Sequence, residues 1–345
     1  MFDYFVVFHS ICIFSALMGT SRHRKINRFF WHLKVVLFCT WLFVFGCTSS
    51  IHPKPQELPE VSFEVIRFEQ LFFGDLDTPL DQLKSQYPYF FPSNTPNSVW
   101  QAKRTDSLQQ ALFHATLPLF GDNLKLRTAN VLKHAKYYFP AEKLPEKVIT
   151  LLTDVDYSLR AVDADSLLLI SIDTYLGASH PLYEGIPKYI KNKLTPLHLE
   201  AEIIDALSHR YVSKTISRAF LDRMVVHGKR LLLHDYLSPK ASAHFHIQYT
   251  QDQWDWATAH ESDVWHYFVD NDFLFSTDEN LNFRFLTAGP YSKFYSYLDE
   301  NSPGRIGQWM GYRIVKAYQK RTGASLQQVL AAKTQEILKK SRYNP

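Results

Sequence analysis

The chain has 345 residues, of which 46% are hydrophobic, 15% aromatic and 21% charged, with a formal net charge of +4. This composition is too apolar and too aromatic for a disordered chain and is typical of a globular protein. Five of the 38 basic and one of the 34 acidic residues lie within 1–46, which leaves 33 of each sign over 47–345. The balanced charge of that larger part gives no basis for a polyanion partner, and we expect no nucleic acid to bind.

The first 46 residues are predicted to be a signal peptide. A basic stretch over 21–34 precedes an apolar run over 35–45 and a small residue, Gly46, which matches the plan of a secretory leader. The apolar run is shorter than the roughly 20 residues that a membrane-spanning helix needs. Residues 1–17 precede the basic stretch, whereas a true start at Met18 would give an ordinary leader.

Cys47 closes a sequence, Val44-Phe45-Gly46-Cys47, that resembles a bacterial lipobox. The resemblance implies diacylglycerol attachment at Cys47, cleavage before it, and acylation of the new amino group by a fatty acid such as palmitate. Two or more acyl chains anchor a protein stably to a membrane, where one chain is marginal. Phe45 is bulky for this motif, and the alternative is an ordinary signal peptide followed by a chance cysteine.

The mature chain divides into a tether and one domain. Residues 48–60 are polar, contain prolines and show no apolar period, so 47–60 is predicted to be an extended, lipidated tether. No further linker or internal repeat follows, and 61–345 is predicted to be a single domain. No cysteine follows Cys47, so this domain has no internal disulfide.

The predicted elements give an α+β fold. Alternating or short apolar runs predict strands at 61–65, 147–153 and 167–172. Thr105 and Asp122 are expected helix N-caps, and Ser325 opens a capping box. Helices are predicted at 106–119, 123–138, 196–212, 217–236, 251–270, 306–321 and 325–341. The sequence thus predicts a small β-sheet in the first half and a predominantly α-helical second half.

Seven segments of the mature chain carry a family resemblance: 87–92, 153–157, 164–170, 173–177, 185–190, 290–295 and 302–311. Together with the lipobox, in this order, they resemble the GldB gliding-motility lipoprotein family of Bacteroidetes-type bacteria. The resemblance implies an envelope lipoprotein required for gliding, working near the type IX secretion and motility apparatus with other envelope proteins as partners. It implies no established catalytic residues.

The family is also distantly similar to predicted zinc peptidases with a zincin-like layout. In those, a helix carries His-Glu-x-x-His and a Glu-Gly on the next long helix supplies the third ligand. The matching positions here are Asp205 and His209, which share a helix face, and His227. Ala206 replaces the glutamate that would activate zinc-bound water. The three residues are weak metal candidates, since lone helical His and Asp are more often surface or satisfied groups, and no cofactor is expected.

A second near-motif begins at His260 and Glu261 and includes Asp263 and His266. A complete His-Glu-x-x-His would need histidine at position 264, which is Val264 instead. We therefore favour a packed helix face with a solvated acidic edge over a metal site. The packed face is expected to carry Trp254, Trp256 and Trp265.

Asp154 and Asp156 form an Asp-x-Asp sequence after a predicted strand. The pattern resembles the one that holds a divalent cation in nucleotide-sugar transferases, because hard cations favour carboxylates. Aspartates that cap a turn at the end of a strand explain it equally well. We favour the turn.

The segment 302–309 is the most distinctive in the chain. Gly307 and Gly311 are four residues apart, which leaves one helix face bare for close packing. Arg305 stands near the helix start, against the dipole preference, and so needs a carboxylate or carbonyl partner. An internal clamp to Asp299 or Glu300 is favoured over a role in partner binding.

Three functional hypotheses follow. The first is a non-catalytic component or scaffold of the gliding machinery, lipid-anchored on the periplasmic side of the cell envelope, in the inner or outer membrane. The alternative is a zinc-dependent peptidase or a metal-binding remnant of one. The third is an Asp-x-Asp transferase that binds a nucleotide-sugar with manganese.

Overall fold

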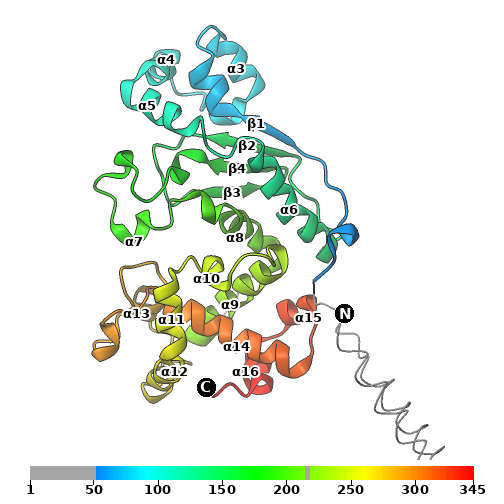
Figure 1. Cartoon of the computed structure of the whole chain (residues 1–345), viewed down its shortest axis with the longest axis vertical. Helices are drawn as coiled ribbons and strands as arrows, with labels where there is room; N and C mark the ends of the chain where they lie inside the picture. The colour runs from blue at the N-terminus through cyan, green and yellow to red at the C-terminus, as the bar shows by residue number, and fades with distance from the viewer. Residues whose placement is uncertain (1–51, 214–217) are drawn as a thin grey trace, which may run out of the picture. The chain divides into compact units, whose positions relative to one another are not determined.

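The computed structural model describes residues 52–213 and 218–345, so Cys47 and the predicted leader lie outside the described residues. The chain divides into two units, 1–51 and 52–345. The second unit places a small sheet beside a larger group of helices (Figure 1), which confirms the predicted α+β class. None of the described helices combines the length and hydropathy that a membrane span requires.

The sheet has four strands in the order β1-β2-β4-β3. Strands β1, β2 and β4 run parallel, and β3 pairs with β4 as an antiparallel hairpin. The bounds are β1 Glu64–Arg67, β2 Lys147–Leu151, β3 Ala161–Ala164 and β4 Leu167–Ser171. Strand β3 was not predicted because it is short and lacks a clear apolar alternation.

Each face of the sheet has its own hydrophobic core. Alternate residues of β2 and β4 point to opposite faces, so Val148 and Leu168 join one core and Ile149 joins the other. The smaller core is rich in phenylalanine and is covered by three helices (Figure 1). These are α3 Leu80–Gln86, α4 Asn97–Thr105 and α5 Ser107–Thr116.

The N-cap of α5 differs from the prediction. Asp106, and not Thr105, caps this helix, because its carboxylate accepts hydrogen bonds from Leu108 N at 3.0 Å and Gln109 N at 2.9 Å. The Thr105 hydroxyl instead donates to the Gln101 carbonyl at 3.3 Å, inside the preceding helix α4. The sequence did not predict α4, so Thr105 was mistaken for a helix start.

The larger core lies between the sheet and the remaining helices. Helix α6, Asn123–Tyr138, has the predicted bounds, and it is followed by the short α7, Lys188–Lys191. The next two long helices are α8 Leu199–Tyr211 and α9 Phe220–Leu237. Short 3-10 segments are Pro55–Glu57, Pro88–Phe90, Ile172–Tyr175, Pro181–Tyr183, Pro196–His198 and Tyr297–Asp299, and a π-helical turn spans Gln70–Gly74.

Two predicted helices of the C-terminal half are each broken in two. The stretch 251–270 forms α11 and α12, which meet at His260, and both Ala257 and Val264 are fully buried. The stretch 325–341 forms α15 and α16, separated by two extended residues, although Ser325 makes the predicted capping box. The helices of this half are α10 Ala243–His246, α11 Gln251–Ala259, α12 Glu261–Asp270, α13 Asn280–Phe285, α14 Ile306–Thr322, α15 Leu326–Ala331 and α16 Thr334–Ser341.

Helices α9 and α14 cross with their backbones in direct contact. A Cβ atom added to Gly311 would lie 1.8 Å from the Met224 carbonyl oxygen, and one added to Gly228 would lie 2.3 Å from the Gly311 carbonyl carbon. Gly307 packs against other neighbours, because a Cβ atom added there would lie 2.9 Å from Leu286 Cδ2 and 3.0 Å from the Phe285 carbonyl oxygen. The predicted close packing of Gly307 and Gly311 is confirmed.

Candidate functional site

A polar cleft opens beside α8. Its inner cavity of about 420 Å³ adjoins an outer cavity of about 820 Å³. The two cavities share four lining residues, namely Tyr189, Lys193, Gln248 and Arg305.

Separate segments bring the charged side chains of the inner cavity together. Arg160 directly precedes β3, and Lys193 lies in the connection between α7 and α8. Glu202 and Asp205 are three residues apart on α8, and so project from neighbouring positions of one helix face. Arg305 enters from the start of α14, where its backbone adopts a left-handed conformation with φ of 65°. Three basic side chains and two carboxylates thus line one cavity.

Glu202 is the centre of a buried hydrogen-bond network in this cavity. Its Oε1 accepts hydrogen bonds from Arg160 Nη1 and from Gln248 Nε2, the latter at 2.6 Å. The Arg160 guanidinium also lies 4.8 Å from the centre of the Tyr175 ring, an arrangement typical of a cation–π contact. Arg160 is only 5% exposed, yet its Nε and Nη2 have no hydrogen-bond acceptor in the described part of the chain.

The side-chain amine of Lys193 has no hydrogen-bond or ion-pair partner among the residues that the structure describes. Burial lowers the pKa of Lys193 to about 6, and the positive charges of Arg305 and Arg160 add to this effect. Glu202 acts in the opposite direction without restoring the ordinary value. The Lys193 amine is therefore mostly neutral at pH 7.

His198 extends the same polar wall into the outer cavity. Burial, followed by the charges of Arg160 and Lys193, lowers the pKa of His198 to about 3, so its ring stays neutral. Its Nδ1 and the nearby Thr195 hydroxyl have no hydrogen-bond partner within 52–213 and 218–345. A buried polar atom left unpaired destabilises a fold by roughly 1–3 kcal/mol, so native proteins contain few of them and each needs a physical explanation.

Arg305 does not make the expected clamp to an acid. Its Nη2 donates to the backbone carbonyl of Ile247, and its guanidinium lies 6.0 Å from the Tyr249 ring. Asp299 is instead occupied by its own turn, where its carboxylate accepts from the backbone N–H of Tyr295 at 3.1 Å. The predicted carboxylate partners are therefore wrong, whereas the carbonyl alternative is confirmed.

The residues matched to the zincin-like layout do not form a zinc site. Asp205 Oδ1 lies 3.0 Å from His234 Nε2, and His209 Nε2 lies 3.4 Å from an Asp163 carboxylate oxygen. His227 lines another cavity of about 380 Å³. Across 52–213 and 218–345, no three His, Cys, Asp or Glu side chains are grouped to hold a metal ion. The described residues do not fit the ligand set that the resemblance implies.

The Asp205–His234 pair was missed by the sequence analysis. His234 is fully buried on α9, whereas the Asp205 side chain is 45% exposed to the cleft. Although burial opposes it, the neighbouring His234 keeps the pKa of Asp205 below its usual value. The available signal was the spacing of His227 and His234, because residues seven apart share a helix face.

The near-motif at His260 is also dispersed. The His260 ring stacks on Trp256 with centroids 4.3 Å apart, and His266 Nδ1 lies 2.8 Å from the Ser262 carbonyl oxygen. Glu261 accepts from Arg313 Nε at 2.8 Å and from the Tyr343 hydroxyl at 2.5 Å. The predicted packed face is present at Trp265, which is 6% exposed. The predicted solvated edge is wrong at Glu261, whose side chain is 12% exposed and paired.

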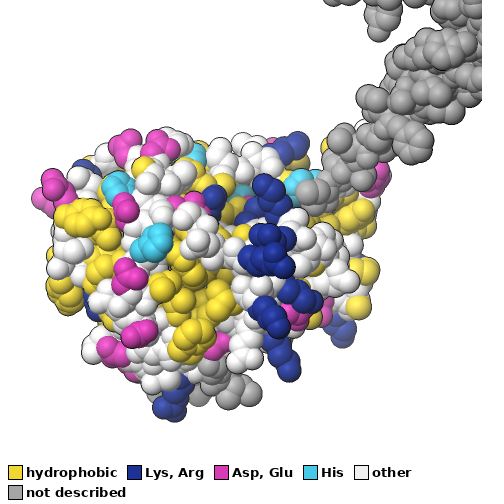
Figure 2. All heavy atoms as spheres, turned by 90° about the horizontal axis from the view of Figure 1, so that it is seen from below, with side chains coloured by type: hydrophobic (Ala, Val, Ile, Leu, Met, Phe, Trp, Pro, Cys, Tyr) yellow, Lys and Arg dark blue, Asp and Glu magenta, His cyan; other side chains and the backbone are white. Residues whose placement is uncertain are grey.

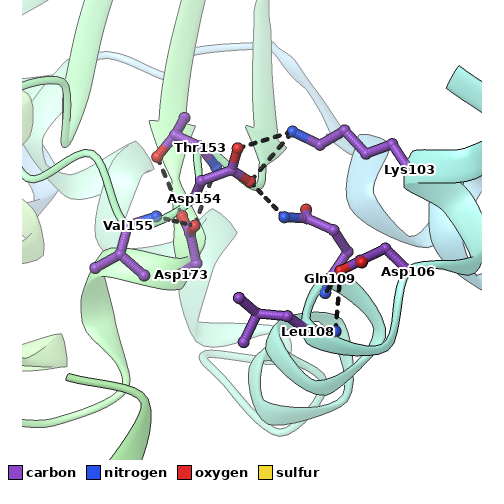
Figure 3. Close-up of polar contacts among 8 residues, drawn as sticks. All are labelled: Lys103, Asp106, Leu108, Gln109, Thr153, Asp154, Val155 and Asp173. Atoms are coloured by element: carbon purple, nitrogen blue, oxygen red, sulfur yellow. Dashed lines mark hydrogen bonds and ion pairs between the residues drawn. The ribbon is translucent and has the colours of Figure 1, made fainter. Parts of the chain in front are cut away.

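Asp154 and Asp156 have separate partners. The Asp154 carboxylate lies 3.0 Å from Lys103 Nζ and accepts from Gln109 Nε2 at 2.7 Å (Figure 3). Asp156 caps a turn through Ser158 N at 3.0 Å, which confirms the turn interpretation for that residue. The buried Asp173 carboxylate accepts from the backbone N–H of Thr153 and Val155, and so braces the turn.

A comparison with known protein families adds a direct observation. The model of the family described as gliding motility protein GldB matches residues 48–345. The chain belongs to this family. No curated protein and no solved structure matches the chain.

Membership of the GldB family ties the chain to gliding motility and to the lipoproteins. The match begins at residue 48, directly after the predicted lipid-attachment residue, Cys47. Cys47 itself lies outside the residues that the structure describes. The family match therefore spans the entire described domain, including the cleft.

Proposed function

We propose that this GldB-family protein is a lipid-anchored, non-catalytic component of the gliding machinery, held on the periplasmic side of the envelope through acyl chains on Cys47. The observation that carries the proposal is the family match over 48–345, which begins directly after a lipobox-like sequence. The protein acts by binding other envelope proteins near the secretion and motility apparatus.

The chemistry of the α8 cleft supports binding over hydrolysis. A zinc peptidase needs a carboxylate that accepts a proton from the metal-bound water, and Ala206 stands at that position. Asp205 is engaged by His234, and His209 faces Asp163. Each of the two α8 residues, Asp205 and His209, thus has a structural partner, and neither needs a catalytic role to explain its position.

The lipid anchor keeps one end of the domain near the membrane. Four residues separate Cys47 from His52 in sequence, and five residue steps reach at most about 18 Å. His52 packs against Tyr236 of α9, with ring centroids 5.4 Å apart. Helices α14 and α16 end in Lys320, Arg321, Lys339 and Lys340. Figure 2 shows a row of Lys and Arg side chains on the face seen from below, a surface suited to anionic lipid headgroups.

Two variants test the anchor and the non-catalytic role. Replacing the lipid-attachment residue, Cys47→Ser, should release the protein from the membrane fraction and abolish gliding. His209→Ala should leave gliding intact, since His209 is exposed on α8. Metal analysis of the purified protein provides the second readout. Stoichiometric zinc that is lost in His209→Ala, together with loss of gliding, would contradict the proposal and favour the peptidase alternative.

A further inference from the structure

The cleft beside α8 brings together basic side chains that are only partly paired within the described part of the chain. Arg160, Lys193 and Arg305 line the inner cavity, where Glu202 pairs with Arg160 and Asp205 pairs with His234. Lys193 is left without a carboxylate partner in the described part of the chain, and the Arg305 head group contacts only a backbone carbonyl and an aromatic ring. Two basic side chains, the Lys193 amine and the Arg305 guanidinium, therefore face the cavity without a direct carboxylate partner among the described residues.

Several buried polar atoms in residues that line this cleft lack a hydrogen-bond partner within 52–213 and 218–345. The Arg160 Nε and Nη2, the Thr195 hydroxyl and the His198 Nδ1 all lack a hydrogen-bond partner within the described ranges. Arg160 and His198 are both more than nine-tenths buried, and both line the cleft. These atoms are themselves inaccessible to solvent, so they make the wall polar from behind, and the side chains left to contact a ligand in the cavity are Lys193 and Arg305.

We propose that this cleft is a binding site for an anionic group, a carboxylate or a phosphate, held between Lys193 and Arg305 and carried by a polar ligand. An anion at this position supplies the missing counter-charge to both side chains. Planar and tetrahedral anions both match the guanidinium fork of Arg305 and the ammonium of Lys193. Arg160 stays paired with Glu202 and contributes positive potential from behind.

The outer cavity indicates what the remainder of the ligand looks like. It is about twice the volume of the inner cavity and is lined by aromatic rings, including Tyr189, Phe245 and Trp256. Side-chain amides also line this cavity, and they offer donors and acceptors to neutral polar groups. Amide-bearing lining residues are Asn192, Gln248, Gln251, Gln253 and Asn301. The ligand is thus a polar molecule larger than the anion alone.

Binding of the anion must couple to protonation of Lys193. Several titratable and charged groups surround this amine. The bases are Arg160 before β3, His198 directly before α8 and Arg305 at the start of α14, and the acids are Glu202 and Asp205 on α8. The cations and burial favour the neutral amine, whereas a bound anion favours the charged form. A nearby opposite charge commonly moves a pKa by about two, which returns Lys193 to the ammonium form at pH 7.

The test uses the chemical reactivity of this amine in the full chain, purified in mild detergent. Acetylation by trace acetic anhydride at pH 7 is followed at Lys193 by peptide mass spectrometry, with the exposed Lys125 as internal control. Inorganic phosphate and succinate are the two probes, each compared with chloride at equal ionic strength. At saturation we expect at least one probe to slow acetylation of Lys193 about tenfold, because the neutral fraction falls from about nine-tenths to one-tenth.

The variant Arg305→Gln should remove this protection, and Arg223→Gln, which alters an arginine that pairs with Glu279 elsewhere, should retain it. Protection by phosphate alone assigns the site to phosphate ligands, and protection by succinate alone assigns it to carboxylates. The proposal is overturned if neither probe protects Lys193 at 50 mM, if chloride protects equally, or if protection persists in Arg305→Gln. A phosphate- or succinate-dependent rise in melting temperature, lost in Lys193→Gln, gives an independent second readout.

Discussion

Lys229 is buried and Lys193 is half-buried, and the surroundings of these two lysines differ. Lys229 on α9 is 9% exposed, and its ammonium donates to the carbonyls of Leu330 at 2.9 Å and Ala332 at 2.6 Å. These carbonyls end helix α15, where a cation is favoured by the helix dipole. Lys193 in the cleft has no such acceptor among the described residues and instead faces Arg160 and Arg305.

Lys229 therefore stabilises the fold through its hydrogen bonds, whereas Lys193 costs the fold stability without such compensation. Burial lowers the pKa of both lysines, but only Lys229 gains hydrogen bonds in exchange. The region around Lys229 includes the α9–α14 crossing, where Gly228 and Gly311 let the two backbones come into direct contact. Proteins that hold unpaired charge in a cleft give up stability there, and this is typical of binding sites.

The largest expected effect is at the α9–α14 crossing, in the region around Lys229. Gly311→Leu should destabilise the domain by about 4 kcal/mol or more, because even its Cβ would meet the Met224 carbonyl oxygen at 1.8 Å. Urea unfolding followed by circular dichroism measures the loss. Gly289→Ala is the matched control, since its nearest contact would be an ordinary 3.5 Å, and it should change stability by less than about 1 kcal/mol. Equal losses of stability for Gly311→Leu and Gly289→Ala would contradict the close packing of helices α9 and α14.

The second prediction removes the satisfied lysine. Lys229→Met should lower the free energy of unfolding by about 2 kcal/mol, because the terminal carbonyls of α15 lose charge-assisted hydrogen bonds. The same urea titration gives this value. A variant as stable as the wild type would mean that these hydrogen bonds do not offset the burial of the charge.

The third prediction concerns Lys193, whose replacement should stabilise the domain and not destabilise it. Lys193→Met should raise the free energy of unfolding by about 1–2 kcal/mol at pH 7, since the fold no longer has to hold an amine beside two guanidinium groups. The sign follows from linkage. The folded pKa of about 6 lies below the unfolded value of 10.5, so the unfolded chain takes up the proton at pH 7 and is favoured. A lower free energy of unfolding for Lys193→Met than for the wild type would contradict the proposed difference between Lys193 and Lys229.

The smallest effect concerns pH. The folded pKa of His198, about 3, lies below its unfolded value of 6.5, so stability is present above pH 6.5 and is lost as the pH falls toward 3. Between pH 7 and pH 5.5 the wild type should lose about 1 kcal/mol more than His198→Gln. His209→Gln, at an exposed position on α8, should keep the wild-type slope. A wild-type slope in His198→Gln would show that His198 is not held neutral by burial.

Local patterns were sufficient to predict much of the fold. The α+β class, the bounds of α6, the capping box at Ser325 and the bare face of Gly307 and Gly311 all follow from interactions within a few residues. The breaks at His260 and at residues 332–333 were not predictable in this way. They arise because both halves of each stretch turn an apolar face into one core, which is a tertiary demand.

The cleft was only partly predictable from the sequence. Arg305 and Asp205 were recognised as unusual, although with the wrong partners, whereas Lys193, Arg160 and His198 carry no local motif. Their role depends on four separate segments meeting beside α8. Charge in a single sequence does not reveal which residues lose water or which partners they meet, and Lys193 differs from Lys229 in facing two guanidinium groups instead of carbonyl acceptors.

The most direct test of this account is gliding by cells whose only GldB-family protein carries Lys193→Met. Immunoblotting of the membrane fraction verifies that the variant is present at the wild-type level, and Lys125→Met is the control substitution. The account predicts a stable, membrane-bound protein whose cells fail to glide, because the cleft can no longer hold its anionic ligand. Gliding at the wild-type rate with Lys193→Met would contradict it.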